Sequence, residues 1–262
     1  MNFCSISSGS SGNSIYVGNK STHILIDAGL SGKKIQEGLK RLDLTGNDIN
    51  AIFITHEHSD HIKGAGILSR RFNLPIYATE GTWRGMEFEL GEISQENRKI
   101  IGKDKSVELG DLYIQAYEIP HDANEPVGYS VFSDNVKVSV ATDIGHITEN
   151  VKKNIKGSSA LLLEANHDVN MLKVGSYPYQ LKRRILGDFG HLSNDTSGEL
   201  LSEILDEKLK YVLLGHLSQE NNHPDLAYIT VSNILKENGI KAGFDLNLGM
   251  APRYECSNII KL

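Results

Sequence analysis

One short segment of the chain carries four side chains of the kinds that bind metal ions: His56, His58, Asp60 and His61. They follow the apolar stretch 51–54, which is typical of a buried strand. Residues two apart in an extended segment point the same way, so we expect His56 and His58 to grip one ion. Asp60 and His61 come where the chain turns into a helix, and we expect them to face a second ion. Imidazole and carboxylate ligands suit zinc, manganese or iron far better than magnesium or calcium.

The composition is that of an ordinary globular protein, with 262 residues, 39% of them hydrophobic and 23% charged. A net charge of −6 gives no general attraction for nucleic acid, so any phosphate binding must come from local patches or metals. We see no signal-peptide pattern and no apolar run of about 18 residues, and therefore expect a cytoplasmic protein that crosses no membrane. Cys4 and Cys256 are expected to stay reduced and to pack as small hydrophobes.

Short apolar strands alternate with helical patterns along the whole chain. No linker or repeat interrupts the alternation, so residues 1–262 are expected to form one α/β domain of sheets covered by helices. The expected strands are 14–17, 23–26, 51–54, 75–78, 112–119, 128–132, 136–141, 160–163 and 211–214. The expected helices are 31–41, 62–72, 80–90, 147–155, 179–186, 195–205 and 224–239.

Three further ligand candidates directly follow predicted strands: His121, Asp143 and His216. One six-residue run cannot complete the coordination of two ions, so additional ligands must come from elsewhere. Residues placed directly after an apolar strand are where α/β proteins gather their sites. We therefore expect these three side chains to close the site that the first run begins.

The full set resembles the metallo-β-lactamase superfamily. Residues 55–61 are similar to its H-x-H-x-D-H motif, and the remaining motifs are matched in order by Asp27, His121, Asp143 and His216. The resemblance implies a four-layer αβ/βα sandwich, two sheets flanked by helices, with the metals at one sheet edge.

The same resemblance implies two divalent ions per chain, zinc by default, with manganese or iron as alternatives. One ion would be held by His56, His58 and His121, the other by Asp60, His61 and His216, with Asp143 bridging. Asp27 would support the ligand loop through hydrogen bonds.

Two metals of this kind imply hydrolysis of C–O or P–O bonds, so the substrate must be inferred from other residues. A β-lactamase fits poorly, because no export signal is predicted and Asp143 stands where secreted lactamases of the commonest type have cysteine. A glyoxalase-type thioesterase also fits poorly, because the C-terminal half does not look like a separate helical glutathione-binding domain.

A nuclease is favoured by two segments that resemble RNase Z-like enzymes. Residues 161–167 are similar to the strand that carries their His-Glu-Ala motif, and residues 190–193 to their His-Ser segment. By this resemblance His191 would contact a phosphate oxygen or protonate the leaving group, oriented by Glu164. The alternative for His191 is a helix-capping role shared with Ser193 and Asp195. His167 is expected at the surface.

The spacing of the motifs narrows the group. The interval between His121 and Asp143 leaves little room for the tRNA-binding arm of RNase Z. The 73-residue interval between Asp143 and His216 is already filled by predicted helices and strands. It thus has no space for the clamp domain of RNase J and the DNA-crosslink-repair nucleases. The compact form and the opening residues 3–14 resemble the YycJ/WalJ group, which implies a 5′→3′ exonuclease acting on DNA.

Two polar segments are candidates for contact with a nucleic-acid substrate, DNA above all. The glycine/serine loop 7–13 would offer Ser10, Ser11 and Asn13 to a phosphate, or it is a plain turn between strands. The basic run Lys182, Arg183 and Arg184, with Tyr177 and Tyr179 nearby, would combine phosphate contacts with base stacking, or it is a solvated helix face.

The hypothesis from sequence is attack on a phosphodiester by a metal-bridging hydroxide. Asp60 would orient the hydroxide while it ligates, and His191 would assist departure of the 3′ oxygen. The rivals on the same metals are an RNase, a cyclic-nucleotide phosphodiesterase, and a small-molecule esterase or lactonase. A non-enzymatic rival is a metal-binding sensor or scaffold. The oligomeric state is left open.

Overall fold

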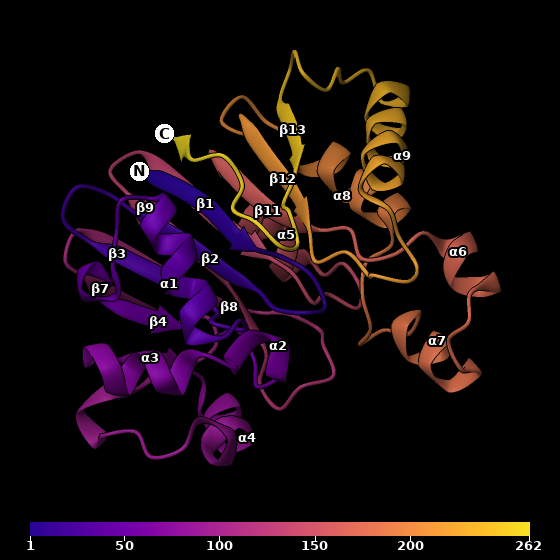
Figure 1. The fold of residues 1–262 in the computed structure, drawn as a ribbon. Helices are drawn as coiled ribbons and strands as arrows, with labels where there is room; N and C mark the ends of the chain where they lie inside the picture. The colour runs from indigo at the N-terminus through magenta and orange to yellow at the C-terminus, as the bar shows by residue number, and fades with distance from the viewer.

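The computed structural model describes residues 1–262 and contains two seven-stranded sheets that lie face to face, with helices on their outer faces (Figure 1). This confirms the predicted α/β sandwich. The first sheet has the order β14-β1-β2-β3-β4-β5-β6. Strands β1 to β3 are antiparallel neighbours, and β3 to β6 run parallel. Their bounds are β1 (Asn2–Ser7), β2 (Ser14–Gly18), β3 (His23–Ile26), β4 (Ala51–Phe53), β5 (Ile76–Ala78), β6 (Arg98–Ile100) and β14 (Ile260–Lys261).

The second sheet has the order β13-β12-β11-β10-β9-β8-β7. Strand β9 is antiparallel to both of its neighbours, and β10 to β13 are parallel. As a result β8, β10, β11 and β12 all end at the same edge of the sheet. The bounds are β7 (Ser106–Leu109), β8 (Leu112–Glu118), β9 (Val127–Ser133), β10 (Val136–Ala141), β11 (Ala160–Glu164), β12 (Tyr211–Gly215) and β13 (Asn247–Met250).

Helices cover the outer face of each sheet. Those over the first sheet are α1 (Gly32–Arg41), α3 (Ala65–Phe72) and α4 (Glu80–Leu90), and those over the second are α5 (Glu149–Ile155), α8 (Asn194–Ile204) and α9 (Pro224–Glu237). Helices α6 (Val169–Val174) and α7 (Tyr179–Ile185) project beyond the sheets, and short α2 (Ser59–Ile62) lies between them and the first sheet (Figure 1). None of the helices has both the length and the apolar character needed to cross a membrane.

Three apolar clusters hold these layers together, one between the sheets and one under each helical layer. In the middle cluster the ring of Phe53 meets that of Tyr129 edge-on, with centroids 5.5 Å apart. Cys4 is buried under the first helical layer and half-buried Cys256 packs against the same cluster, and both are free thiols as expected. Because the strands of both sheets are packed together through these clusters, the positions of the strand ends relative to one another are fixed.

One predicted helix is broken. Residues 62–72 were expected as a continuous helix, whereas α2 ends at Ile62 and α3 begins at Ala65. The cause is Gly64, whose N–H donates to the carbonyl oxygen of Ala28 at 2.7 Å. A Cβ at position 64 would lie 2.3 Å from the Leu30 carbonyl oxygen, so the close approach requires glycine. The break anchors the start of α3 to the loop after β3.

Candidate metal centre and substrate cavity

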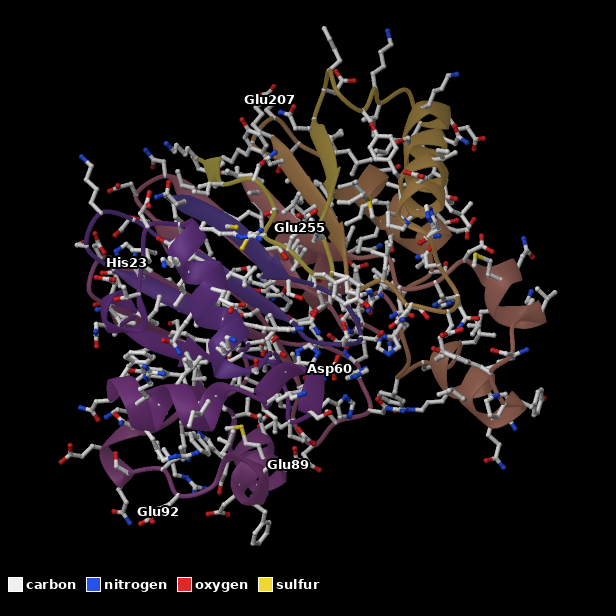
Figure 2. The ribbon with its side chains drawn as sticks, viewed as in Figure 1. His23, Asp60, Glu89, Glu92, Glu207 and Glu255 are labelled. Atoms are coloured by element: carbon white, nitrogen blue, oxygen red, sulfur yellow. The ribbon has the colours of Figure 1, made fainter.

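The loops that leave β3, β4, β8, β10, β11 and β12 meet at one edge of the sandwich, where Asp60 is labelled in Figure 2. Three residues in these loops have left-handed backbones directly after their strands: Asp27 (φ 62°), Asp143 (φ 61°) and His216 (φ 54°). Such conformations cost roughly 1–3 kcal/mol each and persist where the surroundings over-determine them. The chain turns sharply at these positions, so that Asp143 and His216 join the candidate ligands while Asp27 contacts His61 behind them.

The first group of candidate ligands contains three imidazoles: His56, His58 and His121. His56 Nε2 lies 3.0 Å from His58 Nδ1, and donor atoms of all three lie within 4.8 Å of one another. His121 Nδ1 is 3.1 Å from the Gly190 carbonyl oxygen, which leaves Nε2 to face the centre. Burial lowers the pKa of His56 and of His121, which favours the neutral imidazole that binds metals.

The second group contains Asp60, His61 and His216. Oδ2 of Asp60 is 3.4 Å from His61 Nε2 and 3.5 Å from His216 Nε2. Asp143 lies between the two groups, with Oδ2 3.4 Å from His61 Nε2 and Oδ1 3.7 Å from His121 Nε2. The structure thus brings together all seven residues that the sequence singled out as ligands.

The donor atoms in this cluster fit divalent metal ions. His121 Nε2 and Asp143 Oδ2 are buried and have no hydrogen-bond partner in the protein. Buried polar atoms are almost always paired, so two orphans that face other donor atoms indicate an external ligand. Imidazoles and carboxylates in overlapping groups are a donor set for divalent transition metals.

Asp27 supports the ligand loop from below. Its Oδ2 lies 2.8 Å from His61 Nδ1, and its Oδ1 accepts from the backbone N–H of Thr55 at 2.9 Å. Burial raises the pKa of Asp27, although its contacts with His61 and Thr55 oppose the rise. Because a carboxylate accepts the Nδ1 proton, the Nε2 lone pair of His61 is left for a metal.

Asn13 is a second support, because its side chain faces Asp60 and His61 and not the outside of the loop where a phosphate contact was predicted. The side chain is buried, and Nδ2 lies 3.3 Å from Asp60 Oδ2 and 3.2 Å from His61 Nε2. It also closes its own loop, because Oδ1 accepts from the N–H of Gly9 at 2.9 Å. Ser10 and Ser11 are exposed on the outside of the same loop.

Glu164 joins two histidines behind the centre. Its Oε1 lies 2.8 Å from His191 Nδ1 and 2.9 Å from His216 Nδ1. Its Oε2 accepts from the backbone N–H groups of Ile144 and Leu192. The carboxylate is fully buried, which raises its pKa, but the histidines outweigh burial and the net pKa is lowered. An ionised carboxylate here fixes both imidazoles with Nε2 directed away from it.

A cavity of about 340 Å³ opens over this centre. Its walls include four of the seven candidate ligands, together with His191 and Ser10. The projecting segment adds Tyr177, Leu181 and Arg184, and the four ligands are His58, Asp60, Asp143 and His216. Arg184 forms an ion pair with Asp122, the residue that follows His121.

The three residues of the predicted basic run have different surroundings. Lys182 Nζ donates to the carbonyl oxygens of Lys173 at 2.8 Å and Gly175 at 2.7 Å, and so ties α7 to the end of α6. The guanidinium of Arg183 lies 6.0 Å from the ring centroid of exposed Tyr179. Of the three basic residues, Arg184 alone lines the cavity.

The expectation that His167 lies at the surface is wrong. It is buried beside Ser193, because a parallel bridge joins the loop after β11 to the segment that begins α8. Ser193 caps α8 by accepting from the N–H of Thr196 at 3.1 Å, so the capping alternative proposed for His191 belongs to Ser193. His191 instead contacts Glu164 and lines the cavity.

Four residues of the site region were not among the predicted site residues: Asp122, Asn166, Ser218 and Arg253. Asn166 donates from Nδ2 to the His216 carbonyl oxygen at 2.9 Å and lines the cavity with Ser218. Arg253 donates to the hydroxyls of Ser10 and Ser11 at 3.2 and 3.4 Å. The fold brings them to the site from loops that lack a motif, and the acidity of Asp122 beside His121 was the one available cue.

Comparison with known proteins gives consistent results. The family model for the beta-lactamase superfamily domain matches residues 22–216. The chain is 41% identical over 243 residues to exodeoxyribonuclease YycJ of Bacillus anthracis, covering 93% of this chain and 92% of the relative. It is 40% identical over 245 residues to exodeoxyribonuclease WalJ of Streptococcus pneumoniae, covering 93% and 91%.

Solved structures share the fold. The metallo-beta-lactamase fold protein YhfI of Bacillus subtilis superimposes with a TM-score of 0.70 at 14% identity, covering 98% of both chains. With the matched domain and the relatives that align over most of its length, this chain belongs to the metallo-β-lactamase superfamily and, within it, to the family of the YycJ and WalJ exodeoxyribonucleases.

Proposed function

We propose that this protein hydrolyses phosphodiester bonds in DNA as a metal-dependent 5′→3′ exonuclease. The observation that carries the proposal is the His191–Glu164 contact of 2.8 Å at the wall of a cavity that four of the candidate ligands also line. In the proposed reaction His191 would act as a proton donor beside a metal centre that binds a phosphate. Relatives at 40–41% identity named exodeoxyribonucleases support the choice of DNA.

The proposed centre takes two divalent ions, zinc by default, with manganese or iron also suited to the donors. His56, His58 and His121 would hold one ion, Asp60, His61 and His216 the other, with Asp143 shared. Such ions supply an activated water and neutralise negative charge that develops on the phosphate. We assign Asp27 to holding His61 and retain the proposal of one domain over residues 1–262.

The protein's own groups would complete the reaction. Asp60 lines the cavity and would orient the attacking water by accepting a hydrogen bond from it. His191 would donate its Nδ1 proton in a hydrogen bond to Glu164. In the doubly protonated imidazolium form it would also carry a proton on Nε2 and transfer that proton to the departing 3′ oxygen, leaving the neutral imidazole. Glu164 does not touch the substrate, and its role is to hold His191 and His216 in place.

The segment 169–187 supplies the proposed strand contacts outside the cavity. It carries Lys173, Lys182, Arg183 and Arg184 and no acidic residue, in a chain with a net charge of −6. Exposed Tyr179 adds an aromatic face beside Arg183, and Tyr177 lines the cavity. Basic side chains combined with aromatic rings on which bases stack are typical of proteins that bind single-stranded nucleic acid.

The test is digestion of 5′- and 3′-labelled DNA and RNA with zinc, manganese and iron, followed by product sizing. We expect release of the 5′ label as mononucleotide, and loss of this activity in His58→Ala. His23→Gln is the matched control, because His23 lies at the far end of β3 (Figure 2). Hydrolysis of a lactone with no action on bis(p-nitrophenyl) phosphate or DNA would overturn the proposal.

A further inference from the structure

Arg253 is a half-buried cation that has no anionic partner in the protein. Its guanidinium donates to the hydroxyls of Ser10 and Ser11 and to the carbonyl oxygen of Leu217, all neutral acceptors. Arg184, by contrast, is paired with the carboxylate of Asp122. A guanidinium has five N–H donors, so three hydrogen bonds leave donors free for another group. Removing a charge from water without a counter-charge is costly, which favours binding of an anion.

The cavity that Arg253 shares with Ser218 has no carboxylate in its wall, whereas a second cavity that Arg253 also lines includes Glu37 and Glu255. The first of these has a volume of about 420 Å³, and its wall is formed by residues of the loop after β12, the start of α9 and the segment 250–254. Ser218 lines both this cavity and the one over the metal centre. Ser10, which accepts from Arg253, also lines the metal cavity. The two cavities therefore adjoin at Ser10, Ser218 and Arg253.

The backbone holds Arg253 firmly in this position. The Ser8 N–H donates to the Pro252 carbonyl oxygen at 3.1 Å, and the Ser7 hydroxyl donates to the carbonyl oxygen of Arg253 itself at 2.5 Å. The segment then passes Glu255, which is labelled in Figure 2, and runs beside β1. A Cβ on Gly9 would lie 2.7 Å from Nη1 of Arg253, so glycine at position 9 makes room for the guanidinium.

We propose that Arg253, with Ser10 and Ser218, binds a phosphate group of the DNA strand next to the one that is cut. The inference rests on the proposed function, because it needs a substrate with several phosphates. A strand that places one phosphate over the metal centre carries the next only one nucleotide away. The planar fork of arginine suits two phosphate oxygens, and hydroxyls from Ser10 and Ser218 supply additional donors.

The test is binding of a 12-nucleotide, phosphorothioate-linked, fluorescent DNA strand to metal-loaded protein across a range of salt concentrations. Arg253→Met removes the charge while keeping an unbranched side chain, and Arg253→Lys restores the charge. We expect Kd to rise roughly tenfold in Arg253→Met, as for loss of a hydrogen bond to a charged group. The slope of log Kd against log salt should fall by about 0.7, the value for one lost phosphate contact on a single strand. Arg253→Lys should recover the slope.

The controls separate this site from the proposed function. Arg71→Met removes an exposed arginine from the end of α3 and should leave the salt slope unchanged. Strands with a 5′-phosphate or a 5′-hydroxyl distinguish a terminal phosphate from an internal one; a changed slope on either strand supports the site. An unchanged slope and Kd in folded Arg253→Met, while the parent still cuts DNA, would overturn the site alone. A parent that cuts no DNA would instead overturn the proposed function.

Discussion

Oε1 of Glu164 lies 2.9 Å from Nδ1 of His216, so a buried carboxylate at the end of β11 fixes a candidate metal ligand at the end of β12. The same oxygen lies 2.8 Å from His191 Nδ1. One carboxylate therefore sets the proton position on two imidazoles with different proposed roles. Metal retention and proton donation should consequently fail together when its charge is removed.

Glu164→Gln tests this link. The glutamine oxygen can accept from the N–H groups of Ile144 and Leu192. Its NH₂ group then faces Nδ1 of the two histidines and requires these nitrogens to act as acceptors instead of donors. We expect metal affinity and activity each to fall about 10- to 100-fold, as for other residues that orient metal ligands. Metal content by mass spectrometry and kcat on labelled DNA are the readouts.

His191→Ala is the companion variant. It should lower kcat while the bound metal stays near the parent level, because Nδ1 of His191 is occupied by Glu164 and His191 is not one of the seven candidate ligands, although it lies in one group with Asp143 and His216. Normal metal content and normal kcat in Glu164→Gln would show that the contact orients neither histidine.

Asp27→Asn tests the support under His61. Asparagine tolerates the left-handed backbone of position 27, so the loop should keep its shape. Its amide no longer provides a charged acceptor for Nδ1, and we expect metal affinity to fall about tenfold or more, with activity restored at high metal concentration. A metal titration monitored by DNA hydrolysis checks this, and activity that no metal concentration restores would argue against a supporting role.

His167 predicts a pH dependence of stability away from the ligands. Burial lowers its pKa from about 6.5 to about 4, and neither ring nitrogen has a partner. As the pH falls from 6.5 to 4, His167 becomes protonated in the unfolded chain but stays neutral in the folded protein. The free energy of unfolding should therefore drop by up to about 3 kcal/mol across that window.

His167→Leu removes this titration and leaves no unpaired polar atom. The variant should be at least as stable as the parent at pH 7.5 and should lose less stability between pH 6.5 and 4 in urea unfolding. Parallel pH profiles for the two proteins would contradict the assignment of a buried neutral imidazole.

The outer face of α7 should contribute to strand binding. Tyr179→Ala and Arg183→Gln remove an exposed aromatic ring and a neighbouring cation. Stacking of a base on an aromatic side chain is worth about 1–3 kcal/mol, so Kd for single-stranded DNA should rise roughly fivefold or more in Tyr179→Ala. Phe88→Ala, which removes a highly exposed ring from α4, is the control. Equal Kd values for Tyr179→Ala and Phe88→Ala would show that α7 is not part of the binding surface.

The clustering of the candidate ligands could be predicted because most of them closely follow strands that the sequence pattern reveals. His121, Asp143 and His216 come after β8, β10 and β12, which run in the same direction and end at one edge of the sheet. Helices α1 and α4 were likewise predicted, at 31–41 and 80–90, and the structure shows that Ser31 and Thr79 cap them.

Other features depend on contacts between distant parts of the chain. Strand β1 was missed because its serines disguise a buried strand. Asn13 was expected to face a phosphate, but Asp60 and His61 draw its side chain inward. The partners of Arg253 lie more than thirty positions away in sequence, at Leu217 and in the loop 9–12. The cytoplasmic location stays a prediction.

The most direct measurement is release of the 5′ label from DNA as metal is added stepwise to metal-free protein. We predict no release without metal, activity that levels off at about two equivalents per chain as in two-metal hydrolases, and no release at any metal level by Asp143→Asn. Asparagine keeps the left-handed backbone of position 143 while removing the carboxylate between the two groups. Full activity in the metal-free parent, or digestion by Asp143→Asn at the parent rate, would contradict the account.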